Sequence, residues 1–160
     1  MKKLLTILLL LTATNANALE AGLLFGGATV HHSAKFAPQG GYNWNNQTIG
    51  IEVLQGTEGL NFGMSVARFK DSFNKRSIWA LGLVEYRINY EHVNLSTGLG
   101  LGHLKTSYYN GAIVAPYLRF GHNDTGLYAK VIVQPFNNDK ADSFTSAMFG
   151  ISKKFDLPKY

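Results

Sequence analysis

Apolar residues alternate with small or polar ones along most of this chain. Runs of roughly ten residues place an apolar side chain at every second position, which is the period of a β-strand with one apolar face. Almost no segment shows the period of an amphipathic helix. The pattern predicts eight strands, at residues 19–34, 46–55, 58–70, 76–89, 91–105, 112–121, 124–134 and 143–155.

The two faces of these strands differ in chemistry. Between residues 91 and 105, one face carries Val93, Leu95, Thr97, Leu99 and Leu101, and the other carries Asn94, Ser96, Gly98, Gly100 and Gly102. A soluble sandwich or a lipocalin would turn its bulky aliphatic face inward. Here the other face is small and polar, so the pattern favours a barrel whose aliphatic face contacts lipid. A soluble barrel is the alternative.

The connections between the predicted strands alternate in length. Those around 35–45, 71–75, 106–111 and 135–142 are mostly longer, whereas those centred on 56–57, 90 and 122–123 are tight turns. Short turns at one end and longer loops at the other are typical of outer-membrane barrels, whose strands need about 9–11 residues to cross a bilayer. Lipid does not tolerate an open sheet edge. We therefore predict an all-β fold, an eight-stranded antiparallel outer-membrane β-barrel.

The first residues predict export. Lys2 and Lys3 precede the apolar run 4–11, and Ala16-Asn17-Ala18 follows as a small-x-small cleavage site. The run is too short for a membrane-spanning helix, which needs about 20 residues. We expect residues 1–18 to be a cleaved signal peptide and residues 19–160 to form one transmembrane barrel domain in the outer membrane of a Gram-negative-type cell. A membrane anchor or a buried helix is the alternative for the leader.

Composition narrows the classes of function. The chain has no cysteine, which excludes disulfide scaffolds, thiol catalysis and thiolate zinc sites. The net charge of +5 falls to +3 when the two lysines of the leader are removed, so no nucleic-acid partner is expected. His92, His103 and His122 are scattered over turns at both ends of the predicted barrel, so we expect no metal and no cofactor.

Odd-numbered strands run toward the long loops, so residues far apart in sequence are expected to meet at that rim. His31 and His32 end the first strand, Asp71 and Ser72 lie in the second long loop, and Tyr108 flanks the third. A histidine, an aspartate and a serine at one rim are the components of a nucleophile or general-base site. The same residues also have a non-catalytic explanation, because Asp and Ser side chains commonly bond to the backbone in turns and histidines at a strand end are commonly solvated. Residue types alone leave the catalytic and the non-catalytic interpretation open.

Two further features at this rim concern lipids. Pro116 lies inside the sixth strand and Pro135 ends the seventh, and proline donates no ladder hydrogen bond. The wall between these strands is therefore either a lateral slot for a lipid chain or only a bulge followed by a turn proline. Cations also exceed acids here, with Lys35, Lys70, Lys75, Arg76, Lys105 and Lys140 against Asp71, Asp139 and Asp142. Such a rim would hold anionic head groups, or merely tolerate them.

Several motifs resemble those of the lipid A palmitoyltransferases, a family of small outer-membrane barrel enzymes. The most specific is Phe-Lys-Asp-Ser-Phe-Asn-Lys at residues 69–75, which resembles the family's second-loop signature. Weaker matches are Gly41-Tyr42-Asn43 with Ile49-Gly50-Ile51, Pro116 with Gly121, and Pro135-Phe136-Asn137-Asn138. Together they span about residues 28–155, with gaps.

The resemblance implies an enzyme that moves a palmitoyl chain from a phospholipid to the lipid A part of lipopolysaccharide. Its histidine, aspartate and serine would lie at the extracellular rim, above an acyl pocket inside the barrel. The aspartate and serine correspond to Asp71 and Ser72, and the histidine to His31 or His32, which the spacing does not separate. Asp71 would orient the histidine for proton transfer, and Ser72 would act through its hydroxyl.

The charge of the rim and the resemblance together suggest where substrate would bind. Phospholipid donor and lipid A acceptor would contact Lys70, Lys75, Arg76 and Tyr108 at the rim, and Gly82 and Leu83 at the floor of the acyl pocket, with Pro116 and Pro135 marking a lateral gate. A glycine forms that floor in the family, and a leucine near its position would shorten or block the pocket. The family's N-terminal amphipathic helix also has no counterpart here, and residues 156–160 extend past the family's usual end.

Three functions follow from these observations. The first is an acyltransferase acting on lipid A. The second is a catalytically inactive monomeric barrel with a structural, surface-binding or receptor-masking role, which predicts a plugged interior and an Asp71 that only caps a turn. The third is a lipid A deacylase, which would use similar residues but release the chain into water.

Overall fold

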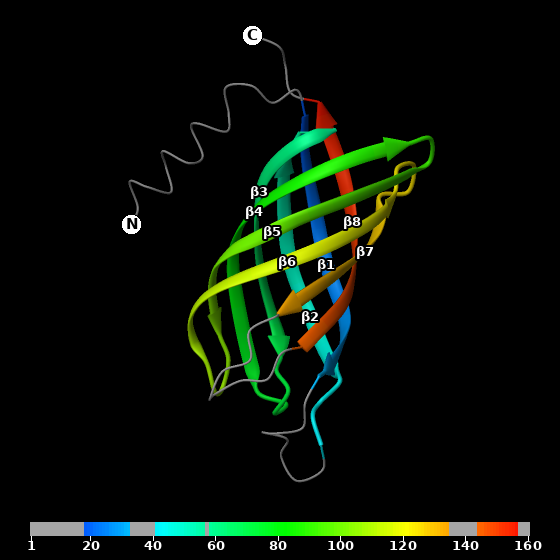
Figure 1. The fold of residues 1–160 in the computed structure, drawn as a ribbon. Helices are drawn as coiled ribbons and strands as arrows, with labels where there is room; N and C mark the ends of the chain where they lie inside the picture. The colour runs from blue at the N-terminus through cyan, green and yellow to red at the C-terminus, as the bar shows by residue number, and fades with distance from the viewer. Residues whose placement is uncertain (1–17, 33–40, 57, 135–143, 157–160) are drawn as a thin grey trace.

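The computed structural model describes residues 18–32, 41–56, 58–134 and 144–156. Within them the chain forms eight strands, which are β1 (Ala18–His31), β2 (Asn45–Gln55), β3 (Gly59–Lys70), β4 (Arg76–Tyr90), β5 (Val93–Lys105), β6 (Asn110–His122), β7 (Leu127–Gln134) and β8 (Phe144–Asp156). Each strand pairs antiparallel with the next, and β8 pairs with β1, so the sheet closes into a barrel (Figure 1). No helix among the described residues is long and apolar enough to cross a membrane.

The strands lie close to their predicted positions, with two later starts. β5 begins at Val93 because Glu91, at φ 44°, belongs to a tight turn. β7 begins at Leu127 because the preceding turn closes at Gly126, where the N–H donates to the His122 carbonyl at 2.9 Å. Alternation alone does not mark where a strand gives way to a tight turn, so both predicted strands start too early.

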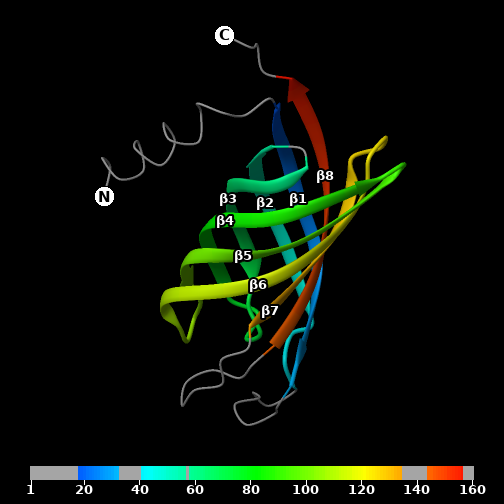
Figure 2. The ribbon, with the colours of Figure 1, turned by 45° about the horizontal axis from the view of Figure 1, so that its top comes forward.

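The two ends of the barrel differ in their connections. The tight turns after β4 and β6 lie at one end, together with the start of β1 and the end of β8, and we call this the tight-turn end (the upper end in Figure 1). The opposite, long-loop end carries the connections after β1, β3, β5 and β7. Figure 2 shows β4, β5 and β6 crossing at a steep incline to β1 and β8, as a closed barrel of tilted strands requires.

The aliphatic face of the strands points outward. On β5, Leu95, Leu99 and Leu101 are 53 %, 44 % and 49 % exposed, while Asn94 and Ser96 on either side of Leu95 are buried. β7 follows the same rule, with Leu127 exposed and Tyr128 and Lys130 buried. An apolar exterior around a polar lumen is the arrangement of outer-membrane barrels. The predicted fold class, an eight-stranded antiparallel barrel of this type, is confirmed.

The lumen contains an apolar layer nearer the long loops. Its buried side chains come from strands all around the barrel, and they include Leu24, Ala67, Trp79, Leu81, Leu104, Ala115, Ile132 and Met148. Phe69 and Ile113 pack against this layer from the long-loop side. The barrel interior is therefore filled by side chains beneath the rim, as is typical of barrels with eight strands.

Candidate functional site

A bulge in β1 decides which histidine points into the barrel. Glu20 and Leu24 face inward, but the register to both neighbouring strands shifts just before Ala28. A β-bulge adds one residue to a strand, and beyond it the opposite set of positions faces inward. Thr29 is accordingly buried, and two positions further His31 points toward the lumen.

His31 and Ser72 meet at the long-loop rim. The Ser72 hydroxyl oxygen lies 2.6 Å from Nε2 of His31, and Ser72 is buried. The imidazole stacks on Tyr42, with ring centroids 3.8 Å apart, and touches Phe144 from the side. His32 lies away from this pair, since its Nε2 is 2.9 Å from the Thr145 hydroxyl on the exposed side of β8. Of the two predicted histidines, the structure therefore places His31 against the serine.

Asp71 caps the turn between β3 and β4. Its Oδ1 accepts hydrogen bonds from the backbone N–H of Phe73 and Lys75 at 3.0 and 2.8 Å. Its Oδ2 accepts from the Ser77 hydroxyl at 3.1 Å and from the Ser107 N–H of the next long loop at 2.9 Å. Oδ1 therefore holds the β3–β4 turn, Oδ2 ties that turn to the next long loop, and these hydrogen bonds do not include His31.

The hydrogen bonds to Asp71 also set its ionisation. Burial raises the pKa of the Asp71 carboxyl, but the donors from Ser107, Lys75 and Ser77 stabilise the charged form more strongly. The net result is a pKa below the ordinary value of 3.8. A carboxylate with these partners is a structural anion at neutral pH.

The predicted head-group residues surround this turn. Lys70 and Arg76 are directly opposite each other at the end of the β3–β4 ladder, and Lys75 lies exposed between them. Tyr108 packs edge-on against Phe73 at 5.1 Å, so it joins the aromatic lining of the rim. The three cationic residues therefore lie in the hairpin that carries Ser72, and Tyr108 is linked to His31 through the rings of Phe73 and Tyr42. Lys35 and Lys140 lie outside the described residues.

The space beneath the rim is small. A cavity of about 40 Å³ lies there, lined on one side by Phe144, the same ring that touches His31. A water-sized group occupies roughly 10–15 Å³ on this measure, so the cavity holds only a few such groups. Leu83 is buried and faces the lumen, whereas the neighbouring Gly82 faces outward. The leucine, rather than the glycine, therefore occupies the interior position.

The wall between β6 and β7 is incompletely paired. Their ladder runs from Gly121↔Tyr128 to Tyr117↔Ile132 and stops one residue before Pro116. Among the described residues, the segment 110–116 of β6 is therefore paired on its β5 side only. Ile113 and Ala115 from this segment line the small cavity. Pro135, the other predicted gate residue, lies outside the described part of the chain.

Charged side chains fill the lumen between the apolar layer and the tight-turn end. This luminal charge cluster has three acids and three bases, namely Glu20, Glu52, Glu85, Arg87, Arg119 and Lys130. Glu20 bonds to both arginines. Arg87 Nη2 also lies 2.7 Å from Glu85 Oε1, and Lys130 Nζ lies 2.5 Å from Glu52 Oε2. Because each charge is paired, the cluster is a neutral plug.

This cluster was not predicted from the sequence, although its signal is present there. All six residues occupy inward-facing positions of predicted strands, with apolar neighbours on either side in several of them, as for Glu52 between Ile51 and Val53. Isolated charges on the luminal face of a narrow barrel must pair across it, because a buried charge without a partner is strongly unfavourable. Balanced acids and bases at such positions would have predicted a plugged lumen.

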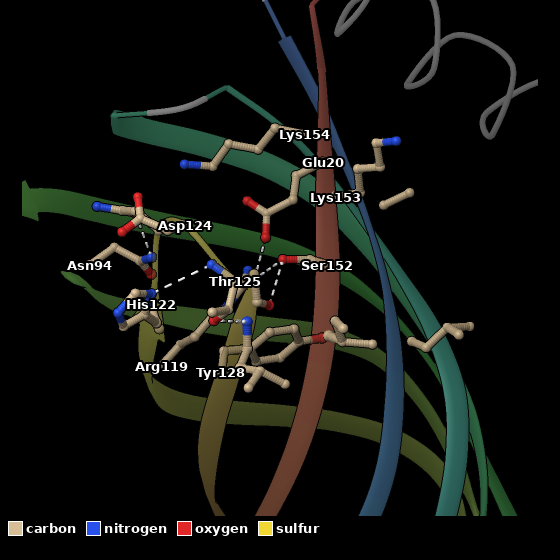
Figure 3. Close-up of a pocket in the computed structure, with 17 residues that line it drawn as sticks. Glu20, Asn94, Arg119, His122, Asp124, Thr125, Tyr128, Ser152, Lys153 and Lys154 are labelled. Atoms are coloured by element: carbon tan, nitrogen blue, oxygen red, sulfur yellow. Dashed lines mark hydrogen bonds and ion pairs between the residues drawn. The ribbon is translucent and has the colours of Figure 1, made fainter. Parts of the chain in front are cut away.

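A larger pocket opens at the tight-turn end. It has a volume of about 550 Å³ and lies between the β6–β7 turn and the ends of β1 and β8 (Figure 3). None of the predicted site residues lines it. Among the residues that the structure describes, no three histidine or carboxylate side chains are placed to share a metal ion.

Comparisons with known proteins support the fold. No protein-family model and no curated protein matches the sequence. The structure is similar to the N-terminal β-barrel domain of Pseudomonas aeruginosa OprF, with a TM-score of 0.52 and 13 % identity, covering 86 % of this chain and 98 % of that domain. It is also similar to Neisserial surface protein A (NspA), with a TM-score of 0.51 and 10 % identity, covering 88 % and 98 %. At these identities the likeness concerns the fold alone, and the resemblance to palmitoyltransferases stays a prediction.

Proposed function

We propose that this chain is a non-catalytic barrel of the outer membrane that binds anionic surface groups at its long-loop rim. The filled lumen is the observation that carries the proposal. The luminal charge cluster occupies one half of the barrel, and the other half leaves a cavity of only about 40 Å³. A long acyl chain would need many times that space, so the interior favours a structural and surface-binding role.

The exterior supports membrane insertion. Large apolar side chains are exposed on every strand of the barrel, for example Ile51 on β2 at 57 % and Ile88 on β4 at 55 %. A soluble monomer rarely exposes apolar surface on this scale. In a bilayer the same surface contacts hydrocarbon, and the closed ladder leaves few unpaired backbone groups there.

The charges of the rim indicate its partner. Lys70 and Arg76 face each other across the end of one hairpin, and Lys75 adds a third positive charge in its turn. Like charges directly opposite each other destabilise a β-ladder. An anionic partner offsets that repulsion, and the phosphate groups of lipopolysaccharide in the outer leaflet have the required charge.

Binding of lipopolysaccharide by the folded barrel tests this proposal. We expect lipopolysaccharide to bind more tightly than its dephosphorylated form, and the double variant Lys75→Gln/Arg76→Gln to lose affinity, by roughly fivefold for each charge removed. The control is Lys153→Gln/Lys154→Gln at the tight-turn end, which should leave this affinity unchanged. Equal binding of both forms of lipopolysaccharide would contradict the proposal.

Acyl transfer to lipid A is the second candidate function. The 2.6 Å contact between the Ser72 hydroxyl and His31 supports it, because an imidazole in that position accepts the hydroxyl proton. The incomplete β6–β7 ladder beside Pro116 offers a route for a lipid chain from the bilayer. For this function the cavity would have to enlarge around the chain. Lipid A that instead loses a chain would indicate a deacylase built on the same pair.

A further inference from the structure

The barrel wall has a notch at the tight-turn end. β7 begins at Leu127, which pairs with Ile151 of β8, whereas β8 continues to Asp156 and pairs there with β1 alone. The pocket of about 550 Å³ lies in this notch, with the β6–β7 turn on one side and β8 on the other. A volume of this size is within the range of sites for small ligands, roughly 300–1,000 Å³.

Gly126 fixes the shape of the notch. The Ser152 N–H of β8 donates to the Gly126 carbonyl at 2.9 Å. A Cβ at position 126 would lie 1.9 Å from the Ser152 carbonyl oxygen, and the glycine has a φ of +69°. Only glycine allows the turn to approach β8 this closely. The pocket is therefore bounded by a turn that is hydrogen-bonded to the strand opposite.

Lysine and arginine side chains outnumber acids among the residues that line the notch, with Arg119, Lys153 and Lys154 against Glu20 and Asp124. Glu20 at the floor bonds to Arg87 and Arg119, and Asp124 of the turn lies 2.7 Å from His92. In contrast, Lys153 and Lys154 form no ion pair with any residue that the structure describes. In Figure 3, Lys154 extends from β8 over the pocket, on the side where Asp124 lies. An anionic group in the notch would meet the Lys154 ammonium group, while Lys153, whose Nζ lies 5.7 Å from the Phe155 ring centroid, extends on the outer side of β8.

An apolar surface continues outward from the notch. Leu23, Ile151 and Leu127 are in register across β1, β8 and β7, and they are 58 %, 43 % and 51 % exposed. All three also line the pocket. The next outward position of β8 is Phe149, which is also exposed. A cationic polar recess therefore adjoins a column of the lipid-facing belt.

From this arrangement we propose that the notch binds one anionic phospholipid of the leaflet at the tight-turn end. The phosphate lies at the edge of β8, where Lys154 reaches it from the pocket side and Lys153 from the outer face, and an acyl chain lies on Leu23, Ile151 and Leu127 of that outer face. A small anion alone would use the lysines but not the apolar column. The inference rests on the proposed membrane insertion of the barrel, and it concerns the end opposite the proposed lipopolysaccharide rim.

Native mass spectrometry of the full barrel in mild detergent tests this site. Phosphatidylglycerol and phosphatidylethanolamine are titrated separately, and one tightly retained phosphatidylglycerol per barrel is expected. The double variant Lys153→Gln/Lys154→Gln should retain it roughly 25-fold less tightly, at about fivefold per lysine. Lys153→Arg/Lys154→Arg should retain it as the parent does, and excess inorganic phosphate should not displace it.

The control is Lys75→Gln/Arg76→Gln, which removes the same charge at the opposite end. It should keep phosphatidylglycerol while losing lipopolysaccharide, so a failure at one end is distinguishable from a failure at the other. Equal retention of the two phospholipids, equal losses in the two glutamine variants, or displacement by inorganic phosphate would each overturn the proposal.

Discussion

The Ser72 hydroxyl lies 2.6 Å from Nε2 of His31, although 41 positions separate the two residues in the sequence. The contact depends on two local features. The bulge in β1 turns His31 inward, and the turn capped by Asp71 presents Ser72 at the same rim. The pair is thus built by backbone geometry at two separate strands, and each feature can be tested by itself.

Substituting Ser72 should report directly on this contact. In Ser72→Ala the hydroxyl partner is lost, so the imidazole nitrogen resonances of His31 should shift in ¹⁵N NMR spectra of the folded barrel. Those of His32, whose Nε2 neighbours Thr145, should stay in place. The control Thr145→Ala should have the converse effect. Movement of the His32 signals in Ser72→Ala would show that the histidines are assigned the wrong way round.

The bulge should be intolerant of a side chain. Gly27 has a φ of +129°, and a Cβ there would lie 3.2 Å from the Thr48 hydroxyl and 3.3 Å from the Ala147 carbonyl. Gly27→Ala should lower the free energy of unfolding by about 1–3 kcal/mol. Gly82→Ala is the matched control, because the nearest atom to its added Cβ is 3.6 Å away, and a change within about 0.5 kcal/mol is expected. Denaturant unfolding in detergent measures both, and similar values for the two variants would contradict the role of the bulge.

Asp71 should matter for stability, and its contribution should depend on pH. Asn at this position retains one acceptor oxygen for four donors, so Asp71→Asn should cost about 1–3 kcal/mol at neutral pH. The pKa of Asp71 is lowered in the folded state, so its stabilisation is complete above the unfolded pKa of about 3.9 and is lost as pH falls through the folded pKa. Unfolding curves of parent and variant should therefore begin to converge as pH falls below about 4, and they should meet only below the folded pKa. A gap that is constant with pH would show that the charge is not involved.

Removing one acid from the luminal charge cluster should be strongly destabilising. Glu20→Gln leaves Arg87 and Arg119 buried with a net excess of positive charge, at a cost of about 3–5 kcal/mol. Glu58→Gln removes an exposed acid at the same end of the barrel and should have little effect on unfolding. If both variants unfold at the same denaturant concentration as the parent, the cluster does not hold the lumen together.

The fold was predictable because strand alternation and the chemistry of each strand face are properties of the local sequence. The period of two identified all eight strands, and the chemistry of Leu95 against Asn94 identified which face is outside. The positions of turns such as 123–126 were less accurate, because a tight turn disturbs alternation very little. The confirmed architecture therefore follows from patterning, and its errors are confined to strand ends.

The candidate site was predictable in composition but not in geometry. The residues at the rim followed from strand direction, yet the choice between His31 and His32 depends on a bulge at Gly26 and Gly27 that strand periodicity does not reveal. Asp71 caps a turn because backbone N–H groups donate to its carboxylate, and one of these, from Ser107, belongs to another loop. The sequence does not show that this loop lies close to Asp71. The pocket beside Lys154 depends on how far β7 and β8 extend past each other, which is a matter of register.

Mass spectrometry of lipid A tests the central claim most directly. The lipid A is taken from cells that produce this chain, its Ser72→Ala variant or its His31→Ala variant. In each strain the barrel is first shown to be folded in the outer membrane. A non-catalytic barrel with a filled lumen predicts lipid A of unchanged mass in all three strains. A gain of one acyl chain with the parent that is lost in both variants would contradict the account and establish an acyltransferase. A loss of one chain with the same dependence would contradict it equally and establish a deacylase.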